Sequence, residues 1–336
     1  MKCLLIVLVF VSCTTSNQPE LPILGATGLT LRHYEHNNLT INLQAQNANL
    51  YSNLTLLTYW QLTVDDEFYS GDKVISNEEL GEIELHNFYS RTADYTLASP
   101  HLFYRQNTGE AEAALATITS ESYQISGENF NFSGDNQFSF GANVSLTVSA
   151  EEESAAITFT ANTMNSFFRG GQNILLLEGN TRIESDDFEI TAHIVELSGQ
   201  DYNLIMAQGN VRIYRKASST VITSDNFNYN RTTLHLTAAG NVYIIDAEQN
   251  LRVRSLFLEQ AGENANYFLS GSVIVMKDEI FARAGSAIYD STNETLLLIG
   301  EAEAVQDGNV MRADRIEINT ATNTIRMVGN VSGRAN

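Results

Sequence analysis

Cysteine is nearly absent from this chain, and both cysteines, Cys3 and Cys13, lie within the first 13 of its 336 residues. The rest of the sequence therefore has no thiol that could form a disulfide, ligate a metal or act as a nucleophile. A chain of this length can instead be stabilised by burial of apolar side chains alone. The sequence thus predicts a fold that depends on its hydrophobic core.

Basic residues are also scarce. The chain has 19 Lys and Arg against 40 Asp and Glu, which gives a net charge of −21. Nucleic acids and anionic membrane surfaces require positive charge on the protein, so both are excluded as expected partners, and the charge is interpreted as favouring solubility. Only 3 prolines interrupt the chain, and few segments show a helical pattern.

Motifs of known catalytic sites are missing too. The sequence contains no P-loop, dinucleotide-binding glycine motif, serine-hydrolase elbow or H-E-x-x-H zinc motif. The six histidines are scattered, and the closest pair, His33 and His36, is interpreted as lying on the surface. Asp65-Asp66-Glu67 and Asp186-Asp187 are interpreted as solvated turns. We therefore expect no catalytic residue, no metal and no cofactor.

The N-terminus has the pattern of an export signal. An apolar run from Cys3 to Val11 is too short to span a bilayer but suits the hydrophobic region of a signal peptide. The segment 10–13, Phe-Val-Ser-Cys, resembles the lipobox of bacterial lipoproteins, which implies cleavage after residue 12 and lipid attachment at Cys13. Residues 13–23 are then a lipidated tether. The alternative is an ordinary signal peptide with an incidental cysteine.

An internal repeat organises the second half of the sequence. Its glycines recur 29 to 31 residues apart and are mostly followed by asparagine. The repeat glycines are Gly179, Gly209, Gly240, Gly271, Gly300 and Gly329. Because they fall on the same alternating parity as apolar residues, we expect them to face the interior and to let each strand bend or bulge.

Apolar residues stand two and four positions on either side of these glycines, and mostly polar residues stand between them. A period of two over about nine residues predicts a strand with one buried face and one wet face. The predicted inward residues that could line an apolar groove are Leu177, Ile183, Ile213, Leu236, Val242, Ile244, Leu269, Val273 and Leu298. Arg182, Arg212 and Tyr243 are expected on the opposite face.

A second strand lies between successive glycines, and polar turns lead back to the next glycine strand. Each repeat is thus a small antiparallel unit that cannot bury its apolar face alone, so stacked repeats should share one interior. The first half also shows strand alternation, most clearly over residues 138–148. The acidic segment 151–154 is taken as a boundary between the two halves.

These motifs carry a resemblance to known families. The pattern G-N-V-x-I, an A-D or S-D strand, and a polar turn back to L-x-L-x-G-N-V over residues 155–336 is similar to the OstA/LptA family of periplasmic lipopolysaccharide-export proteins. Residues 24–150, with Gly28-Leu29-Thr30-Leu31 and the strand 39–45, look like the related LptC family. The domain order expected is therefore signal peptide 1–12, tether 13–23, an LptC-like β domain and an OstA-like β-repeat domain.

The resemblance implies an all-β fold, an elongated antiparallel β-jellyroll open along one side. It also implies a non-enzymatic, periplasmic, membrane-anchored bridge that shields the acyl chains of lipopolysaccharide or a related glycolipid on their way to the outer membrane. Implied partners are an inner-membrane export complex and an outer-membrane LptD-like protein, joined by end-to-end strand pairing.

Two alternatives stay open. One is a structural or adhesive β-repeat protein with a fully packed interior. The small inward residues Ala207, Ala238, Ala302 and Ala304 are interpreted as leaving space, which counts against it. The other is a polysaccharide-active enzyme, which would need paired carboxylates in neighbouring repeats. Asp225 and Asp314 do not stand in neighbouring repeats.

Overall fold

The computed structural model describes residues 24–35, 38–133, 137–149, 156–262, 266–290 and 292–334. The predicted signal peptide, Cys13 and the tether lie outside these residues, as does His36. Nearly all of the described chain forms antiparallel β-strands, so the predicted all-β repeat fold is confirmed. It divides into two compact units. Unit 1 runs to residue 156 and includes 161–168, while unit 2 comprises 157–160 and 169–336.

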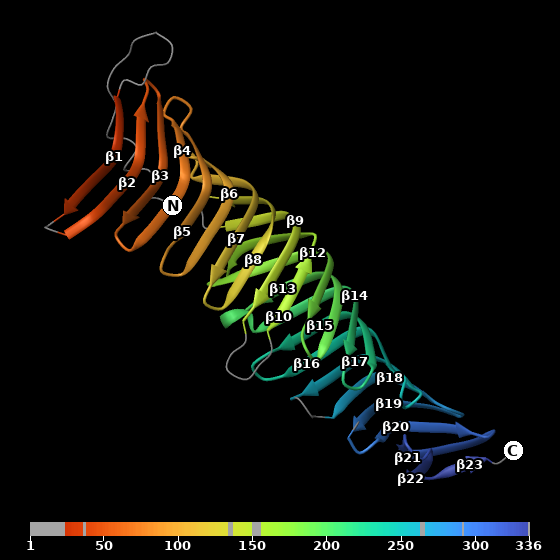
Figure 1. Cartoon of the computed structure of the whole chain (residues 1–336). Helices are drawn as coiled ribbons and strands as arrows, with labels where there is room; N and C mark the ends of the chain where they lie inside the picture. Colours follow the sequence, from red (N-terminus) through yellow and green to blue (C-terminus); the bar gives the residue numbers. More distant parts are fainter. Residues whose placement is uncertain are drawn as a thin grey trace. The chain divides into compact units, whose positions relative to one another are not determined.

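In unit 1, each strand from β1 to β9 pairs with the next one in the sequence (Figure 1). The strands are β1 (Leu24–Glu35), β2 (Asn38–Leu50), β3 (Leu54–Val64), β4 (Glu67–Asn77), β5 (Glu82–Arg91), β6 (Tyr95–Arg105), β7 (Glu110–Ser120), β8 (Tyr123–Ser133) and β9 (Gln137–Val148). Their buried and exposed residues alternate, which places side chains such as Trp60, Leu102 and Phe130 in the core.

In unit 2, consecutive strands pair in the same way from β12 to β22. The elements are β10 (Ile157–Ala161), β12 (Gln172–Glu184), β13 (Phe188–Ser198), the short 3-10 helix η1 (Gln200–Tyr202), β14 (Leu204–Arg215), β15 (Thr220–Asn230), β16 (His235–Asp246), β17 (Leu251–Ala261), β18 (Tyr267–Lys277), β19 (Ile280–Asp290), β20 (Thr295–Gln306), β21 (Asn309–Asn319), β22 (Thr324–Val328) and β23 (Ser332–Arg334).

Two short strands alternate between the units. Residues Thr158 to Thr160 of β10 pair with Glu184 to Arg182 of β12, within unit 2. The following strand, β11 (Thr163–Arg169), pairs through Met164 and Asn165 with β9, within unit 1. The chain therefore contributes a strand to unit 2 and then returns to unit 1. Whether residues 24–150 are LptC-like stays a prediction.

Five of the six repeat glycines lie in β-bulges and Gly329 lies between β22 and β23, but none of the six faces the core. Gly179 and Asn180 together lie opposite a single residue of β13, His193, because the pairing shifts between Glu178 and Thr181. Gly179 has a φ of 77° and Asn180 a φ of 50°. The same pair of positive angles recurs at all six repeat glycines and the residue after each.

The predicted inward orientation of these glycines is thus wrong. All six are half-buried or exposed, because the two residues of the bulge carry the strand out of regular alternation and back again. The prediction that a strand bends or bulges at its glycine is confirmed for the five glycines from Gly179 to Gly300. Glycine is favoured there because a side chain at positive φ is strained, and asparagine follows because it tolerates that region better than most residues.

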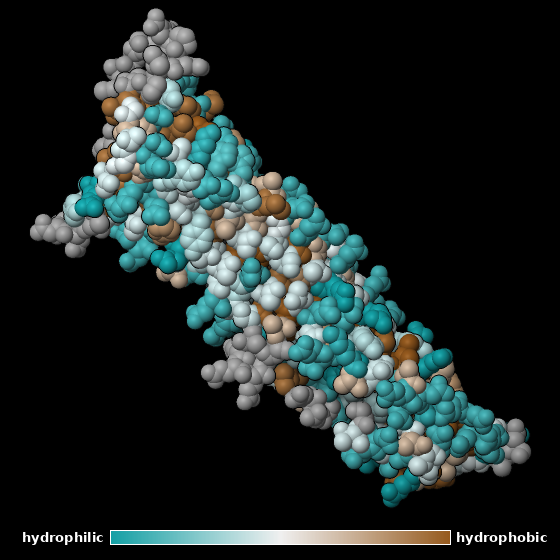
Figure 2. All heavy atoms as spheres, viewed as in Figure 1, coloured by the Kyte–Doolittle hydropathy of each residue, from teal (hydrophilic) through white to brown (hydrophobic). Residues whose placement is uncertain are grey.

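The bulge preserves the orientation of the apolar residues on both sides of it. In β16, for example, Ala238 before the bulge and Val242 after it are each no more than 1% exposed. Both halves of a long strand therefore bury side chains on the same face, so a paired set of such strands encloses one interior. On the face shown in Figure 2, hydrophilic residues predominate and hydrophobic ones form small scattered groups. Among the described residues, no helix is long and apolar enough to cross a membrane.

Candidate functional site

The interior of unit 2 is the strongest candidate for a functional site, because it contains all nine predicted groove residues. Each of these side chains is at most 4% exposed. They belong to β12, β14, β16, β18 and β20, and the intervening strands supply the rest of the lining. The predicted outward residues Arg182 and Arg212 are exposed, and Tyr243 is half-buried. The alternation in the sequence therefore assigned the two faces correctly.

The inward residues line up across the strands in apolar ladders. One ladder contains the residues that follow the bulges of β12, β14, β16, β18 and β20, together with their partners on the strands between. It runs through Ile183, Ile190, Ile213, Ile222, Ile244, Val253, Val275, Ala282 and Ala304. A second ladder, before the bulges, runs through Leu177, Val195, Ala207, Phe227, Ala238, Leu258, Leu269, Ala287, Leu298 and Ile316. These two ladders form a continuous apolar surface from β12 to β20.

The alanines of this interior do not leave water-accessible space. Ala207 and Ala238 both pair with Phe227, which is 2% exposed and lies between them. Ala302 and Ala304 are no more than 1% exposed. The small size of these residues therefore does not argue against a fully packed interior, contrary to the interpretation drawn from the sequence. The interior is packed by its own side chains in this state.

The two edges of the folded sheet of unit 2 meet through side-chain contacts. Because consecutive strands are antiparallel, the connections between them alternate between the two edges of the sheet. Edge A contains the connections that follow β12, β14, β16 and β18, and edge B contains those that follow β13, β15, β17, β19 and β21. Residues at edge A contact residues at edge B three connections further along the chain. We call this set of contacts the seam.

The seam is built mainly from polar and aromatic groups. Its contacts are Phe188 with Tyr229 (ring centroids 6.0 Å apart), Arg215 with Gln260 and with the ring of Tyr267 (5.4 Å), Tyr289 Oη donating to Asp246 Oδ2 (3.3 Å), Gln249 Nε2 donating to Glu294 Oε1 (3.0 Å), and Asn323 Nδ2 donating to Asp278 Oδ2 (2.9 Å). The hydrogen-bonded pairs are 43 to 45 residues apart in sequence. Contacts of the seam therefore recur at a nearly constant sequence separation along unit 2.

Titratable groups in the seam have perturbed pKa values. Burial, followed by the nearby carboxylate of Asp246, raises the pKa of Tyr289 well above its ordinary value of 10.0. Hydrogen bonds from Lys277, Asn250 and Asn323 lower the pKa of Asp278 to about 2. Tyr289 is thus a neutral donor and Asp278 an ionised acceptor across the neutral pH range, which suits both to hold the two edges together.

No sequence pattern indicated the seam, because the residues that meet there share no local spacing. Nor did it point to a second cluster in unit 1, where Glu84, His86 and His101 come together on β5 and β6. Of the predicted turn Asp65-Asp66-Glu67, the two aspartates connect β3 to β4, whereas Glu67 is the first residue of β4. The predicted turn Asp186-Asp187 is confirmed in the connection between β12 and β13. Cys13 lies outside the described residues, so lipid attachment there stays a prediction.

Comparison with known proteins supports the resemblance drawn from the sequence. Residues 221–324 match the family model described as LptA/(LptD N-terminal domain) LPS transport protein. This segment runs from β15 into β22 and contains three of the repeat glycines. The similarity to the OstA/LptA family is therefore confirmed there.

Similarity to individual proteins is weak. No curated protein sequence matches the chain. Among solved structures, LptH of Pseudomonas aeruginosa, described as the LptA homologous periplasmic component of the lipopolysaccharide transport device, aligns with 11% identity over 54% of this chain and 94% of its own. The TM-score of this alignment is 0.18.

Proposed function

We propose that this protein is a non-enzymatic, periplasmic lipid-binding bridge whose unit 2 shelters the acyl chains of lipopolysaccharide or a related glycolipid. The single observation that carries the proposal is that the family match to lipopolysaccharide-transport proteins, residues 221–324, coincides with the continuous apolar interior. Acyl chains need a dry apolar surface of sufficient length and no catalytic group, and each buried CH₂ contributes about 0.8 kcal/mol.

Lipid would enter this interior through the seam. Each hydrogen bond of the seam contributes about 0.5–1.5 kcal/mol net, because water can replace it when the edges separate. A glycolipid acyl chain of about 12 carbons gains roughly 9 kcal/mol on burial by the same CH₂ value. Opening the seam breaks a few side-chain hydrogen bonds, whereas separating two backbone-paired strands would break many more hydrogen bonds. The seam is therefore the cheaper route of entry.

The proposal extends to anchoring and partners. Lipidation at Cys13 would tether unit 1 to a membrane, and the terminal strands would pair with partner proteins. Among the described strands, β1 pairs with β2 alone, and most of its residues are exposed, including Leu24, Leu31 and Tyr34. At the other end, β22 pairs with β21, and Val328 is exposed. Exposed strand edges of this kind are suited to strand addition by another protein.

A second candidate function also has an observation in its favour. The near-zero exposure of the inward residues fits a structural or adhesive β-repeat protein whose interior is permanently packed. The two candidates differ in whether a host lipid ever contacts the interior. The enzyme alternative gains no support from Asp225 and Asp314, since each accepts a hydrogen bond from the asparagine that follows the next repeat glycine.

Photo-crosslinking in the native host tests the proposal. A photoreactive residue at Val242 or Leu269, both 0% exposed, should capture a lipid, and one at the exposed Arg212 should not. A bis-maleimide bridge between cysteines introduced at Gln249 and Glu294 should block that capture by holding the seam closed. Lipid adducts at all three positions alike, or at none of them in a functional host, would leave the packed β-repeat as the function.

A charged substitution supplies an independent measurement. Val242→Asp should impair lipid transport more than its effect on stability explains, because a carboxylate interrupts the apolar surface between β14 and β18. Circular dichroism must show that the variant folds, since burying the carboxylate could also unfold the strand. A folded Val242→Asp variant with normal transport would contradict the proposed route.

A further inference from the structure

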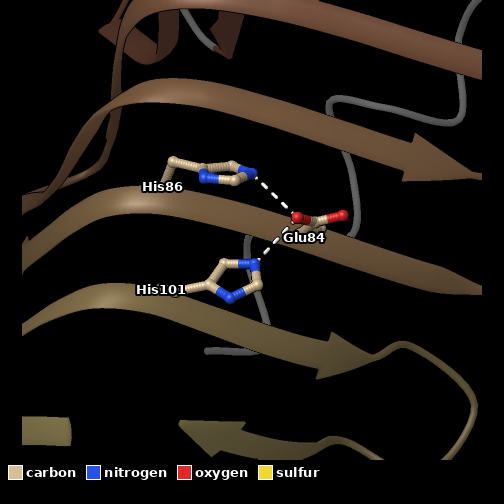
Figure 3. Close-up of side chains that lie close together, drawn as sticks. All are labelled: Glu84, His86 and His101. Atoms are coloured by element: carbon tan, nitrogen blue, oxygen red, sulfur yellow. Dashed lines mark hydrogen bonds and ion pairs between the residues drawn. The ribbon is translucent and has the colours of Figure 1, made fainter. Parts of the chain in front are cut away.

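Three potential ligand side chains converge on the outer face of unit 1. Glu84 and His86 belong to β5, and His101 lies directly opposite His86 on β6. Figure 3 shows the two imidazole rings directed at the same carboxylate oxygen. Oε1 of Glu84 is 2.8 Å from Nε2 of His86 and 2.8 Å from Nε2 of His101. The three donor atoms all lie within 4.8 Å of one another.

The hydrogen bonding within this cluster is incomplete. His101 forms an aligned hydrogen bond with Glu84, but Nε2 of His86 has no aligned partner although the same oxygen is close to it, and the atom itself is buried. A buried ring nitrogen without a partner normally costs free energy. A cation bound between the three donor atoms would satisfy His86 and Glu84 together.

We propose that Glu84, His86 and His101 bind a divalent transition-metal cation, with Zn²⁺ as the best match to the donors. Two imidazole nitrogens and one carboxylate oxygen are common Zn²⁺ ligands, and the bonds are about 2.0–2.2 Å long. Tetrahedral coordination at those lengths separates neighbouring ligand atoms by about 3.3 Å, so the present 2.8 Å contacts need to widen only slightly. Water would complete the coordination.

The cluster is open to solvent on the side of His101. His101 borders an open hollow of about 300 Å³, which is also lined by Phe103, Glu112 and Asn129. The side chains of His86 and His101 are 34% and 46% exposed, so a cation can reach them from solvent. The net charge of −21 also attracts cations to the protein.

Charged neighbours act in opposite directions on the proposed ion. Lys73 on β4 lies opposite His86 and disfavours a cation. Glu112 on β7 lies opposite Phe103, but its carboxylate is engaged by Arg105 at 2.8 Å. This site lies on the outer face of unit 1, and metal binding there does not depend on lipid binding in unit 2.

Isothermal titration of Zn²⁺ into the mature chain, prepared without a polyhistidine tag, tests the inference near neutral pH. We expect saturable binding of one ion per chain, weakened more than about tenfold in either His86→Gln or His101→Gln. His235→Gln is the matched control. His235 also lies 2.9 Å from a carboxylate, that of Glu259, but among the described residues no third ligand joins that pair.

Co²⁺ provides a spectroscopic measurement of the same site. The wild-type protein should show visible absorption bands of nitrogen- and oxygen-coordinated Co²⁺, and Glu84→Gln should shift or abolish them. Circular dichroism should show that all variants remain folded. Absence of saturable Zn²⁺ binding in the wild type, wild-type affinity in both histidine variants, or equal loss in His235→Gln would each overturn the proposal.

Discussion

Asn241 Nδ2 donates a hydrogen bond to Asp225 Oδ2 at 2.9 Å, which joins the bulge of β16 to the S-D motif of β15. The same relationship recurs between Asn330 and Asp314, where the distance is 3.0 Å. Both asparagines follow a repeat glycine and have positive φ angles. The A-D or S-D motif therefore has a structural role, since its carboxylate holds the side chain of the asparagine that follows the next repeat glycine.

The repeat glycines should differ in their tolerance of alanine. At Gly240, a Cβ atom would lie 2.5 Å from Asp225 Oδ2, whereas at Gly300 it would come no nearer than 4.0 Å, to the backbone of Gly285. Their φ angles are 77° and 82°, so both substitutions carry a backbone cost of about 1–2 kcal/mol. Gly240→Ala should therefore lower the free energy of unfolding more than Gly300→Ala, as measured by urea denaturation. Equal losses would show that only the backbone angle matters.

The seam should respond to alkaline pH through Tyr289. Its pKa is raised in the folded state, so its contribution to stability is complete below the ordinary pKa of 10.0 and is lost as pH rises through the folded value. Tyr289→Phe should cost about 1–2 kcal/mol at neutral pH, because Asp246 loses a buried hydrogen bond. The stability difference between the wild type and this variant should then shrink above about pH 10. Thermal unfolding across that range measures it, and a constant difference would contradict the assignment.

The C-terminal strands should be dispensable for the fold of unit 2. Deleting residues 326–336 removes most of β22 and all of β23, which pair with β21 alone among the described strands. Repeat stability is a sum of local contributions, so circular dichroism should show that the rest remains folded. A photo-crosslinker at Val328 in the full-length protein should capture a protein partner, and binding of that partner should fall on truncation. Global unfolding of the truncated chain would contradict the expectation that the stability of the repeats is a sum of local contributions.

Membrane association should depend on Cys13. Replacing it with serine should leave the protein without a lipid anchor and shift it from the membrane fraction to the soluble fraction. Mass spectrometry of the mature N-terminus provides the decisive measurement, because the lipoprotein interpretation requires a modified cysteine as the first residue. If Cys13→Ser still sediments with membranes and the mature chain begins elsewhere, an ordinary signal peptide becomes the better interpretation.

Local sequence patterns were sufficient to predict the strands and their two faces. Alternation with a period of two is a local property, so it assigned Leu177, Val242 and Leu269 to the interior without any knowledge of their partners. The recurrence of glycine also predicted that the strands bend or bulge at these positions. It could not show which way the glycine faces, because parity counting assumes a regular strand and a bulge of two residues breaks that assumption.

Contacts between residues far apart in the sequence became visible only in the folded chain. Asp246 and Tyr289 are 43 residues apart, and their contact depends on how the folded sheet brings its two edges together. His86 and His101 became neighbours because β5 and β6 pair in a register that places them opposite each other. A shift of one residue would move their side chains to opposite faces. Strand periodicity is encoded within each segment, whereas register and edge contacts arise from the packing of the whole unit.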